Sequence, residues 1–255
     1  MLQFDELRDF LEYKTNQYNC PAFIDEDPIS IPHLFSRSED IEIAALMTAI
    51  LSWGGRKAII KSARQLMALM HDTPYEFVMN ASPGEINRLS VFVYRTFNGN
   101  DAILFINSLR NIYMNHGGLK EVFSSRWEKG IASTLIHFRE TFFLHSPMPV
   151  HASKHVADVN KGASAKRLNM FLRWMVRDDK NGVDFGVWKH LDSASLCLPL
   201  DVHTGNVARK LGLLGRSQND WRSVEEVTSR LRQFDPNDPI KYDFALFGLG
   251  VYEKF

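Results

Sequence analysis

The sequence predicts an all-α fold, and two patterns carry this prediction. Apolar residues recur at spacings of three and four through most of the chain, as they do on the buried face of a helix. The apolar-polar alternation of a half-buried strand is scarce. With 255 residues, 45% of them hydrophobic, the chain is long enough to bury one large core or two smaller lobes.

The first predicted helix is a strongly apolar segment. Ser36-Arg37-Ser38-Glu39 has the Ser-x-x-Glu form of a capping box, which predicts a helix start. The segment from Ile41 to Leu51 is almost continuously hydrophobic, so we expect a helix that is buried on most sides. Trp53-Gly54-Gly55 then ends it.

The remaining helices follow in order, separated by Pro and Gly. Their apolar spacing places them at 56–70, 74–80, 83–90, 101–115, 128–143, 164–177, 202–211, 222–233 and 239–250. No Gly-, Ser- or Pro-rich linker divides the chain. Any two lobes therefore share the chain closely and are not joined by a tether.

The net charge is zero, but the charges are distributed unevenly. The first 50 residues are strongly acidic, and this segment should repel DNA. Residues 151–177 are basic, which predicts either a local nucleic-acid-binding face or a solvated helix face. The basic side chains are Lys154, Lys161, Lys166, Arg167, Arg173 and Arg177.

Several classes of protein are disfavoured. The acidic start does not have the form of a signal peptide, and no apolar run is long enough to span a bilayer. Cys20 and Cys197 are far apart and lack metal-ligand spacing, which argues against a disulfide framework, structural zinc or an iron–sulfur cluster. We expect a cytoplasmic protein with no obligate protein partner.

The segment 199–214 has the clearest local pattern. Asp201 stands where a helix N-cap belongs, and Gly212 suits the left-handed turn that ends a helix. Val207, Leu211 and Leu214 give an apolar stripe. An N-cap carboxylate accepts backbone N–H bonds at the positive end of the helix dipole, so we expect Asp201 to be ionised. On this pattern alone Asp201 is a structural cap.

Several segments resemble the helix-hairpin-helix DNA glycosylases. Asp201-Val202-His203 followed by residues 207–213 resembles the family stretch V-D-T-H-V-x-R-V-x-x-R-L-G-L. Residues 161–172 resemble the family's hairpin and following helix, L-P-G-V-G-x-K-T-A-x-x-x-L, with Ser164 in place of the second glycine. The likeness spans about residues 40–250. As a whole, the sequence is most similar to a bacterial conserved-domain family of unknown function.

The resemblance implies two helical lobes with a cleft between them. The central, barrel-like lobe would comprise residues 40–177 and include the hairpin. Residues 1–39 and 178–255 would form the second lobe, with 178–198 as an insertion. The interval from Lys166 to Asp201 is similar to that of archaeal oxidised-guanine glycosylases.

The implied activity is excision of a damaged base, by analogy an oxidised purine, from double-stranded DNA, with lyase activity. Lys166 aligns with the family's nucleophilic lysine, and Asp201 aligns with its catalytic carboxylate. Burial and the nearby Arg167 and Arg173 would lower the pKa of the lysine. Asp201 would orient or deprotonate it.

Further residues are assigned smaller roles by the same resemblance. DNA contacts are expected at Gly162, Ser164, Arg167, Arg173, His203, Arg209 and Lys210. Trp53 and Gly54 would line the base pocket, although Trp53 also suits plain core packing. No cofactor is expected beyond a monovalent cation that the hairpin could hold.

Two rival interpretations remain open. His151-x-x-x-His155 places two imidazoles on one face of a helix, and with Asp201 and His203 they could bind a divalent metal and hydrolyse a phosphoester. The other rival is a non-catalytic DNA-binding protein, which would tolerate substitution of Lys166.

Overall fold

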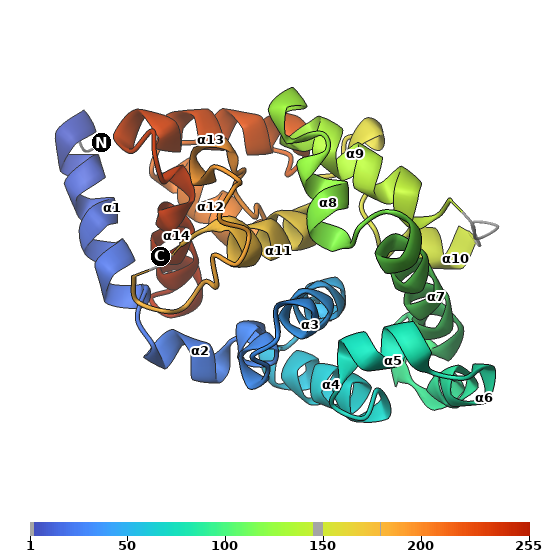
Figure 1. The fold of residues 1–255 in the computed structure, drawn as a ribbon. Helices are drawn as coiled ribbons and strands as arrows, with labels where there is room; N and C mark the ends of the chain where they lie inside the picture. The colour runs from blue at the N-terminus through green and yellow to red at the C-terminus, as the bar shows by residue number, and fades with distance from the viewer. Residues whose placement is uncertain (1–2, 145–149, 179) are drawn as a thin grey trace. The chain divides into compact units, whose positions relative to one another are not determined.

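The computed structural model describes residues 3–144, 150–178 and 180–255, and over these ranges the chain is mainly helical (Figure 1). The predicted all-α class is therefore confirmed. Two short strands, β1 (Val93–Tyr94) and β2 (Phe97–Asn98), form an antiparallel hairpin that the sequence pattern did not predict. Among the described residues, no helix has the length and apolarity that a membrane crossing requires.

The chain divides into two compact units. The terminal unit contains residues 1–25 and 158–255, and the middle unit contains residues 26–157. The boundaries thus differ from the expected 40–177 lobe, because the hairpin and the helix after it belong with the chain ends. The physical reason is that this helix carries Arg173 and Arg177, which pair with carboxylates of the C-terminal segment.

The middle unit is built around α3 (Ser38–Leu51), in which every residue from Ile41 to Leu51 is buried, as predicted. The predicted capping box is wrong. The N-cap is Arg37, whose side chain donates to the Glu39 carboxylate at 3.0 Å and caps no backbone N–H. Helix α3 packs against α4 (Arg56–Leu69) and α5 (Pro74–Asn80).

The remaining elements of the middle unit follow the predicted order, with short helices added. They are η1 (Pro28–Ser30), η2 (Pro32–Leu34), α6 (Pro83–Asn87), η3 (Arg88–Val91), α7 (Gly99–Asn115), α8 (Leu119–Ser124), η4 (Trp127–Lys129), α9 (Ile131–Phe142) and α10 (Val150–Ser153). Along the chain, helix α2 (Ala22–Glu26) contains the boundary between the two units, which falls after Asp25.

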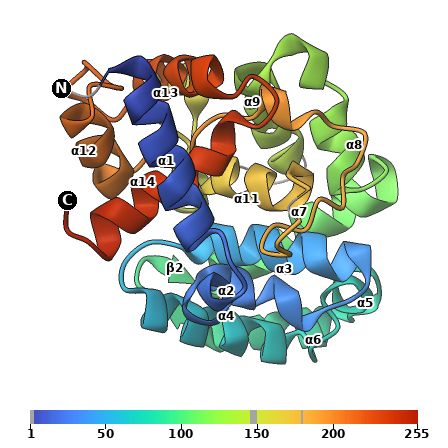
Figure 2. The same cartoon turned by 90° about the vertical axis from the view of Figure 1, so that its left-hand side faces the viewer.

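The terminal unit is organised around α14 (Tyr242–Val251), which packs against α1 (Phe4–Tyr18) and α12 (Val202–Lys210) (Figure 2). The approach of α1 requires Gly248, since a Cβ there would lie 2.1 Å from the Tyr18 ring. Helix α1 was absent from the sequence prediction. The other elements are η5 (Val159–Lys161), α11 (Lys166–Val176), η6 (Ser193–Ser195), α13 (Trp221–Phe234) and η7 (Pro239–Lys241).

Candidate functional site

Lys166 and Asp201 meet within the terminal unit. Lys166 is the first residue of α11, and Asp201 is the N-cap of α12. The Lys166 Nζ atom lies 3.3 Å from Asp201 Oδ2, and the two side chains are 28% and 22% exposed. The structure therefore brings together the two residues that the sequence singled out, in a pair that solvent can still reach.

The predicted capping role of Asp201 is confirmed. Its Oδ1 accepts the backbone N–H groups of His203 at 2.8 Å and Thr204 at 3.0 Å, while Thr204 Oγ1 accepts the Asp201 N–H at 2.9 Å. Gly212, with a φ of 75°, provides the predicted left-handed turn after α12. Oδ1 thus serves the helix, and Oδ2 remains for Lys166.

The Asp201 carboxyl has a lowered pKa. Burial raises this pKa, but the charge of Lys166 and the Thr204 N–H lower it further than burial raises it. Asp201 is therefore held ionised next to the amine, as its position at a helix N-terminus predicted.

The hairpin before α11 sets the direction of Lys166. Gly162 and Ala165 adopt left-handed conformations, with φ values of 81° and 50°, and Ala165 is the N-cap of α11. Ser164, which replaces the second glycine of the expected motif, donates its hydroxyl to the Leu200 carbonyl at 3.4 Å. Because Leu200 precedes Asp201, this bond ties the hairpin to the carboxylate's own segment.

Sequence reasoning missed a second anchor of Asp201. Asn219 donates its side-chain amide to the Asp201 carbonyl at 3.0 Å and accepts from Arg209 at 2.6 Å. Gly205 admits this amide, since a Cβ there would lie 2.7 Å from Asn219 Oδ1. Asn219 sits in a polar loop with no periodic pattern, so nothing in the sequence pointed to it.

Arg209 is occupied within the protein. Besides the Asn219 side chain, its guanidinium donates to the carbonyls of Arg216 at 2.6 Å and Gln218 at 3.0 Å. These bonds hold the 216–219 loop against α12. Through Asn219, Arg209 also supports the segment of Asp201. Its phosphate contact stays a prediction.

Arg173 was expected to contact DNA and to lower the pKa of Lys166, but it is 4% exposed. Its Nε lies 3.1 Å from Asp184, and Nη1 also contacts Asp243. Two carboxylates therefore offset its charge, and we remove Arg173 from the set of DNA contacts. The charges of Lys166 and Asp201 also act on the buried Asp243 carboxyl. Burial and the Asp201 charge raise its pKa to about 6, against the opposing effects of Arg173 and Lys166.

The other expected DNA contacts vary in exposure. Gly162, His203 and Lys210 are exposed. Arg167 is partly covered, and burial lowers its pKa to about 10. The Gly162 carbonyl accepts the Trp221 N–H at 3.0 Å, so part of the hairpin backbone is already bonded.

The expected base-pocket residues belong to the middle unit. The Arg95 guanidinium lies over the Trp53 ring, 4.6 Å from the centroid of the ring. The Trp53 ring also contacts the Tyr94 ring edge-on. Gly54 has a φ of 106°, and a Cβ there would lie 3.0 Å from Arg95. Trp53 and Gly54 thus form a local cation–π cluster with the β-hairpin.

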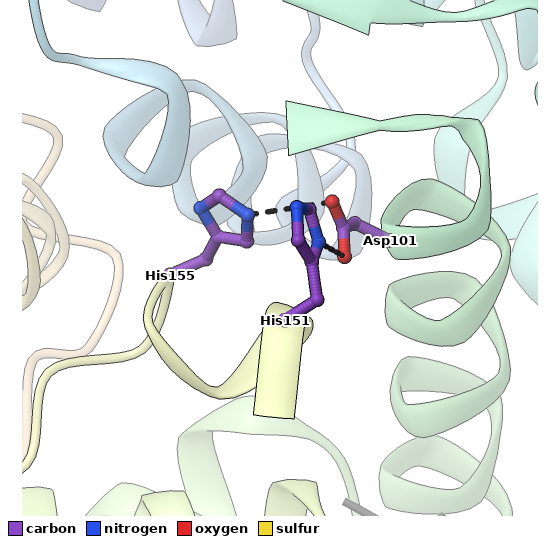
Figure 3. A group of neighbouring side chains, drawn as sticks. All are labelled: Asp101, His151 and His155. Atoms are coloured by element: carbon purple, nitrogen blue, oxygen red, sulfur yellow. Dashed lines mark hydrogen bonds and ion pairs between the residues drawn. The ribbon is translucent and has the colours of Figure 1, made fainter. Parts of the chain in front are cut away.

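A second group of polar side chains lies wholly in the middle unit. His151 and His155 converge on Asp101, near the start of α7 (Figure 3). Among the described residues, this is the group of His, Cys, Asp or Glu side chains whose ligand atoms are close enough to share a metal ion. The expected partners Asp201 and His203 are not part of it. Asp101 was missed because it lies 50 residues before His151 in the chain, and no local pattern links the two.

The comparisons with known proteins overturn the expected superfamily. Residues 27–252 match the model of a family described as "Protein of unknown function (DUF2400)". No model of the helix-hairpin-helix glycosylases matches, so that assignment is wrong. Neither the curated proteins nor the solved structures give a match. Since the matching model covers nearly the whole chain, the protein belongs to the DUF2400 family.

Proposed function

We propose that the chain excises damaged bases from DNA, with Lys166 as the attacking amine and Asp201 as the carboxylate that orients it. The contact that carries this proposal is the 3.3 Å approach of Lys166 Nζ to Asp201 Oδ2, with both side chains part-exposed. Covalent catalysis by lysine needs an amine that a substrate can reach and a nearby group that holds it and takes its proton.

The reaction begins when the damaged nucleotide leaves the base stack, because C1′ is otherwise out of reach. Asp201 accepts a proton from the Lys166 ammonium and passes it to solvent. The free electron pair on Nζ then attacks C1′, and the bond from C1′ to the base breaks, so the base departs with the bonding electrons and takes a proton from solvent. As the sugar ring opens, one Nζ proton moves to O4′ and a Schiff base forms between Nζ and C1′, from which loss of a C2′ proton expels the 3′ phosphate.

Asp201 suits this role because its two oxygens do different work. Oδ1 is bonded to the N-terminus of α12, which fixes the carboxylate in place. Oδ2 faces the amine, and the lowered pKa keeps the carboxylate negative. Such a fixed charge stabilises the positive charge that develops on the sugar during departure of the base.

The surface beside the pair also suits a nucleotide. Val202 is 64% exposed, and His203 next to it is exposed as well. An apolar side chain and an imidazole can contact a base or sugar, while exposed Lys161 and Lys210 can reach phosphates.

Borohydride trapping tests this function. Purified protein is mixed with duplexes that each carry one lesion, including an oxidised guanine and an abasic site, and the Schiff base is reduced to a stable adduct. We expect an adduct with wild-type protein and none with Lys166→Gln. Asp201→Asn should keep binding but slow adduct formation by about 100-fold or more, since general acid–base groups contribute roughly 100- to 10,000-fold.

Lys189→Gln is the matched control, because Lys189 is an exposed lysine of the same unit to which no DNA contact is assigned. It should trap at the wild-type rate. Trapping that survives in Lys166→Gln would overturn the assignment of the nucleophile. Specific binding to lesion duplexes without any adduct would favour the non-catalytic DNA-binding alternative.

A further inference from the structure

The cluster of Asp101, His151 and His155 converges from two separate segments of the chain. His151 Nδ1 lies 2.9 Å from Asp101 Oδ1, and His155 Nε2 lies 3.3 Å from Asp101 Oδ2 (Figure 3). One nitrogen or oxygen atom from each residue lies within 4.8 Å of the others. Metal–ligand bonds of about 2.0–2.2 Å place ligand atoms roughly 3–4 Å apart, so small side-chain rotations suffice to hold an ion.

The exposure of the three side chains differs in an informative way. Asp101 is 4% exposed and His155 is 3% exposed, whereas His151 is 46% exposed. A buried carboxylate needs a partner of opposite charge or several hydrogen bonds. Two ligands are thus fixed in the interior and the third lies at the surface, which leaves one side of the group open to water and ions.

The surroundings hold the ligands in place. Asp101 Oδ2 accepts the Asn98 backbone N–H at 2.9 Å in the capping box of α7. Arg139 donates to the Ser153 carbonyl at 2.9 Å and to the Val156 carbonyl, which fixes the turn that carries His155. Hydrogen bonds that orient ligands in this way are typical of metal centres.

We propose that Asp101, His151 and His155 bind one divalent transition-metal ion, with water in the remaining coordination position. Two imidazoles and one carboxylate suit zinc or ferrous iron better than magnesium or calcium, which prefer oxygen ligands. Three protein ligands with an open position are typical of sites that activate a bound water molecule. The proposal is independent of the Lys166–Asp201 chemistry, because all three ligands belong to the middle unit.

The test is metal binding by the tag-free full chain. The protein is stripped with a chelator and titrated with Zn²⁺ by calorimetry, then with Co²⁺, whose visible absorption reports its ligands. We expect one tight ion per chain and a rise in melting temperature on binding. His151→Gln should weaken Zn²⁺ binding by more than about 100-fold, since even outer-sphere substitutions cost 10–100-fold. This variant should fold normally, because His151 is half-exposed.

His190→Gln is the matched control, since His190 is an exposed histidine in the terminal unit. It should bind Zn²⁺ as the wild type does, and so should Lys166→Gln. Asp101→Asn keeps an oxygen for the Asn98 N–H but removes the charge, and it should lose the Co²⁺ spectrum with an unchanged circular dichroism spectrum. Absence of Zn²⁺ and Co²⁺ binding in the wild type, or equal binding in His151→Gln, would overturn the proposal and leave a plain ion pair.

Discussion

The two ends of helix α11 show how one pattern of charges serves two purposes. Lys166, Arg173 and Arg177 are spaced by seven and four residues, so they lie along one side of the helix and its C-cap. At the start, Lys166 meets Asp201 in a part-exposed pair. At the other end, both arginines are about 5% exposed and share Asp184, whose side chain is fully buried.

This difference explains the basic stretch of residues 151–177. The sequence suggested a charged surface, but the two arginines at its end face carboxylates of the same chain. Asp184 bridges them at 3.1 and 3.0 Å, and both carboxylate oxygens of Asp238 accept from Arg177 Nε. A row of like charges thus does not by itself indicate a nucleic-acid surface. Arg173 and Arg177 are covered by carboxylates and stabilise the fold. Lys166 stays accessible to solvent and is therefore available to a substrate.

The largest effect should follow the loss of Asp184. Asp184→Ala leaves two buried guanidinium groups without their shared partner, and breaking a buried ion pair costs about 3–5 kcal/mol. Urea denaturation of the full chain measures this loss. The control is Asp25→Ala at an exposed position, which should change the free energy of unfolding by less than about 0.5 kcal/mol. Equal effects of the two substitutions would show that Arg173 and Arg177 do not depend on Asp184.

Asp201 should show a smaller effect, and one that depends on pH. Asp201→Ala removes the cap of α12 and should cost about 1 kcal/mol near neutral pH, whereas Asp201→Asn keeps a capping oxygen and should cost less. The folded-state pKa lies below the unfolded value, so the stabilisation is present above about pH 4 and is lost as the pH falls further. Denaturation of wild type and the alanine variant between neutral and acidic pH checks this. A gap that widens on acidification would contradict the lowered pKa.

Lys166 should contribute little to stability, in contrast with the arginines. Lys166→Gln breaks a part-exposed pair, so the free energy of unfolding should fall by less than about 1 kcal/mol. The same variant should abolish borohydride trapping. Thermal denaturation together with the trapping assay tests the contrast. A loss comparable with that of Asp184→Ala would mean that Lys166 is structural.

The smallest effect should be a gain at Ala165. An alanine in the left-handed conformation costs about 1–2 kcal/mol, and a glycine avoids this cost. Part of the gain is lost because glycine has more conformational entropy in the unfolded chain. Ala165→Gly should therefore stabilise the protein by about 0.5 kcal/mol, measured as a rise in melting temperature. Ala163→Gly is the comparison, since Ala163 lacks a positive φ. It should lower the melting temperature.

Local patterns predicted much of the fold. The helix 41–51 is buried throughout because nearly all of its residues are apolar, and the break at Trp53-Gly54-Gly55 falls between α3 and α4. Helix α1 was missed, because its polar residues outnumber the narrow apolar stripe of Leu7 and Leu11 that packs onto α14.

Only part of the candidate site could be predicted from the sequence. Lys166 and Asp201 were named from the sequence, and the N-cap role of Asp201 followed from its local pattern. Asn219, Asp243 and Asp101 were not found, because each acts through a partner that is far away in the sequence. The grouping of His151 and His155 with Asp201 could be corrected only by the tertiary structure, since helix spacing says nothing about a third ligand.

The sequence by itself determined most of the helical segments and the ends of α12, because these depend on contacts over three or four residues. It also singled out Lys166 and Asp201. Tertiary structure alone decided which charges are buried and which carboxylate meets which cation. Arg173 and Lys166 are both basic residues of the same predicted helix. Arg173 is enclosed by Asp184 and Asp243, whereas Lys166 remains accessible. Burial sets the free energy of a charge, and burial depends on segments that are brought together only by folding.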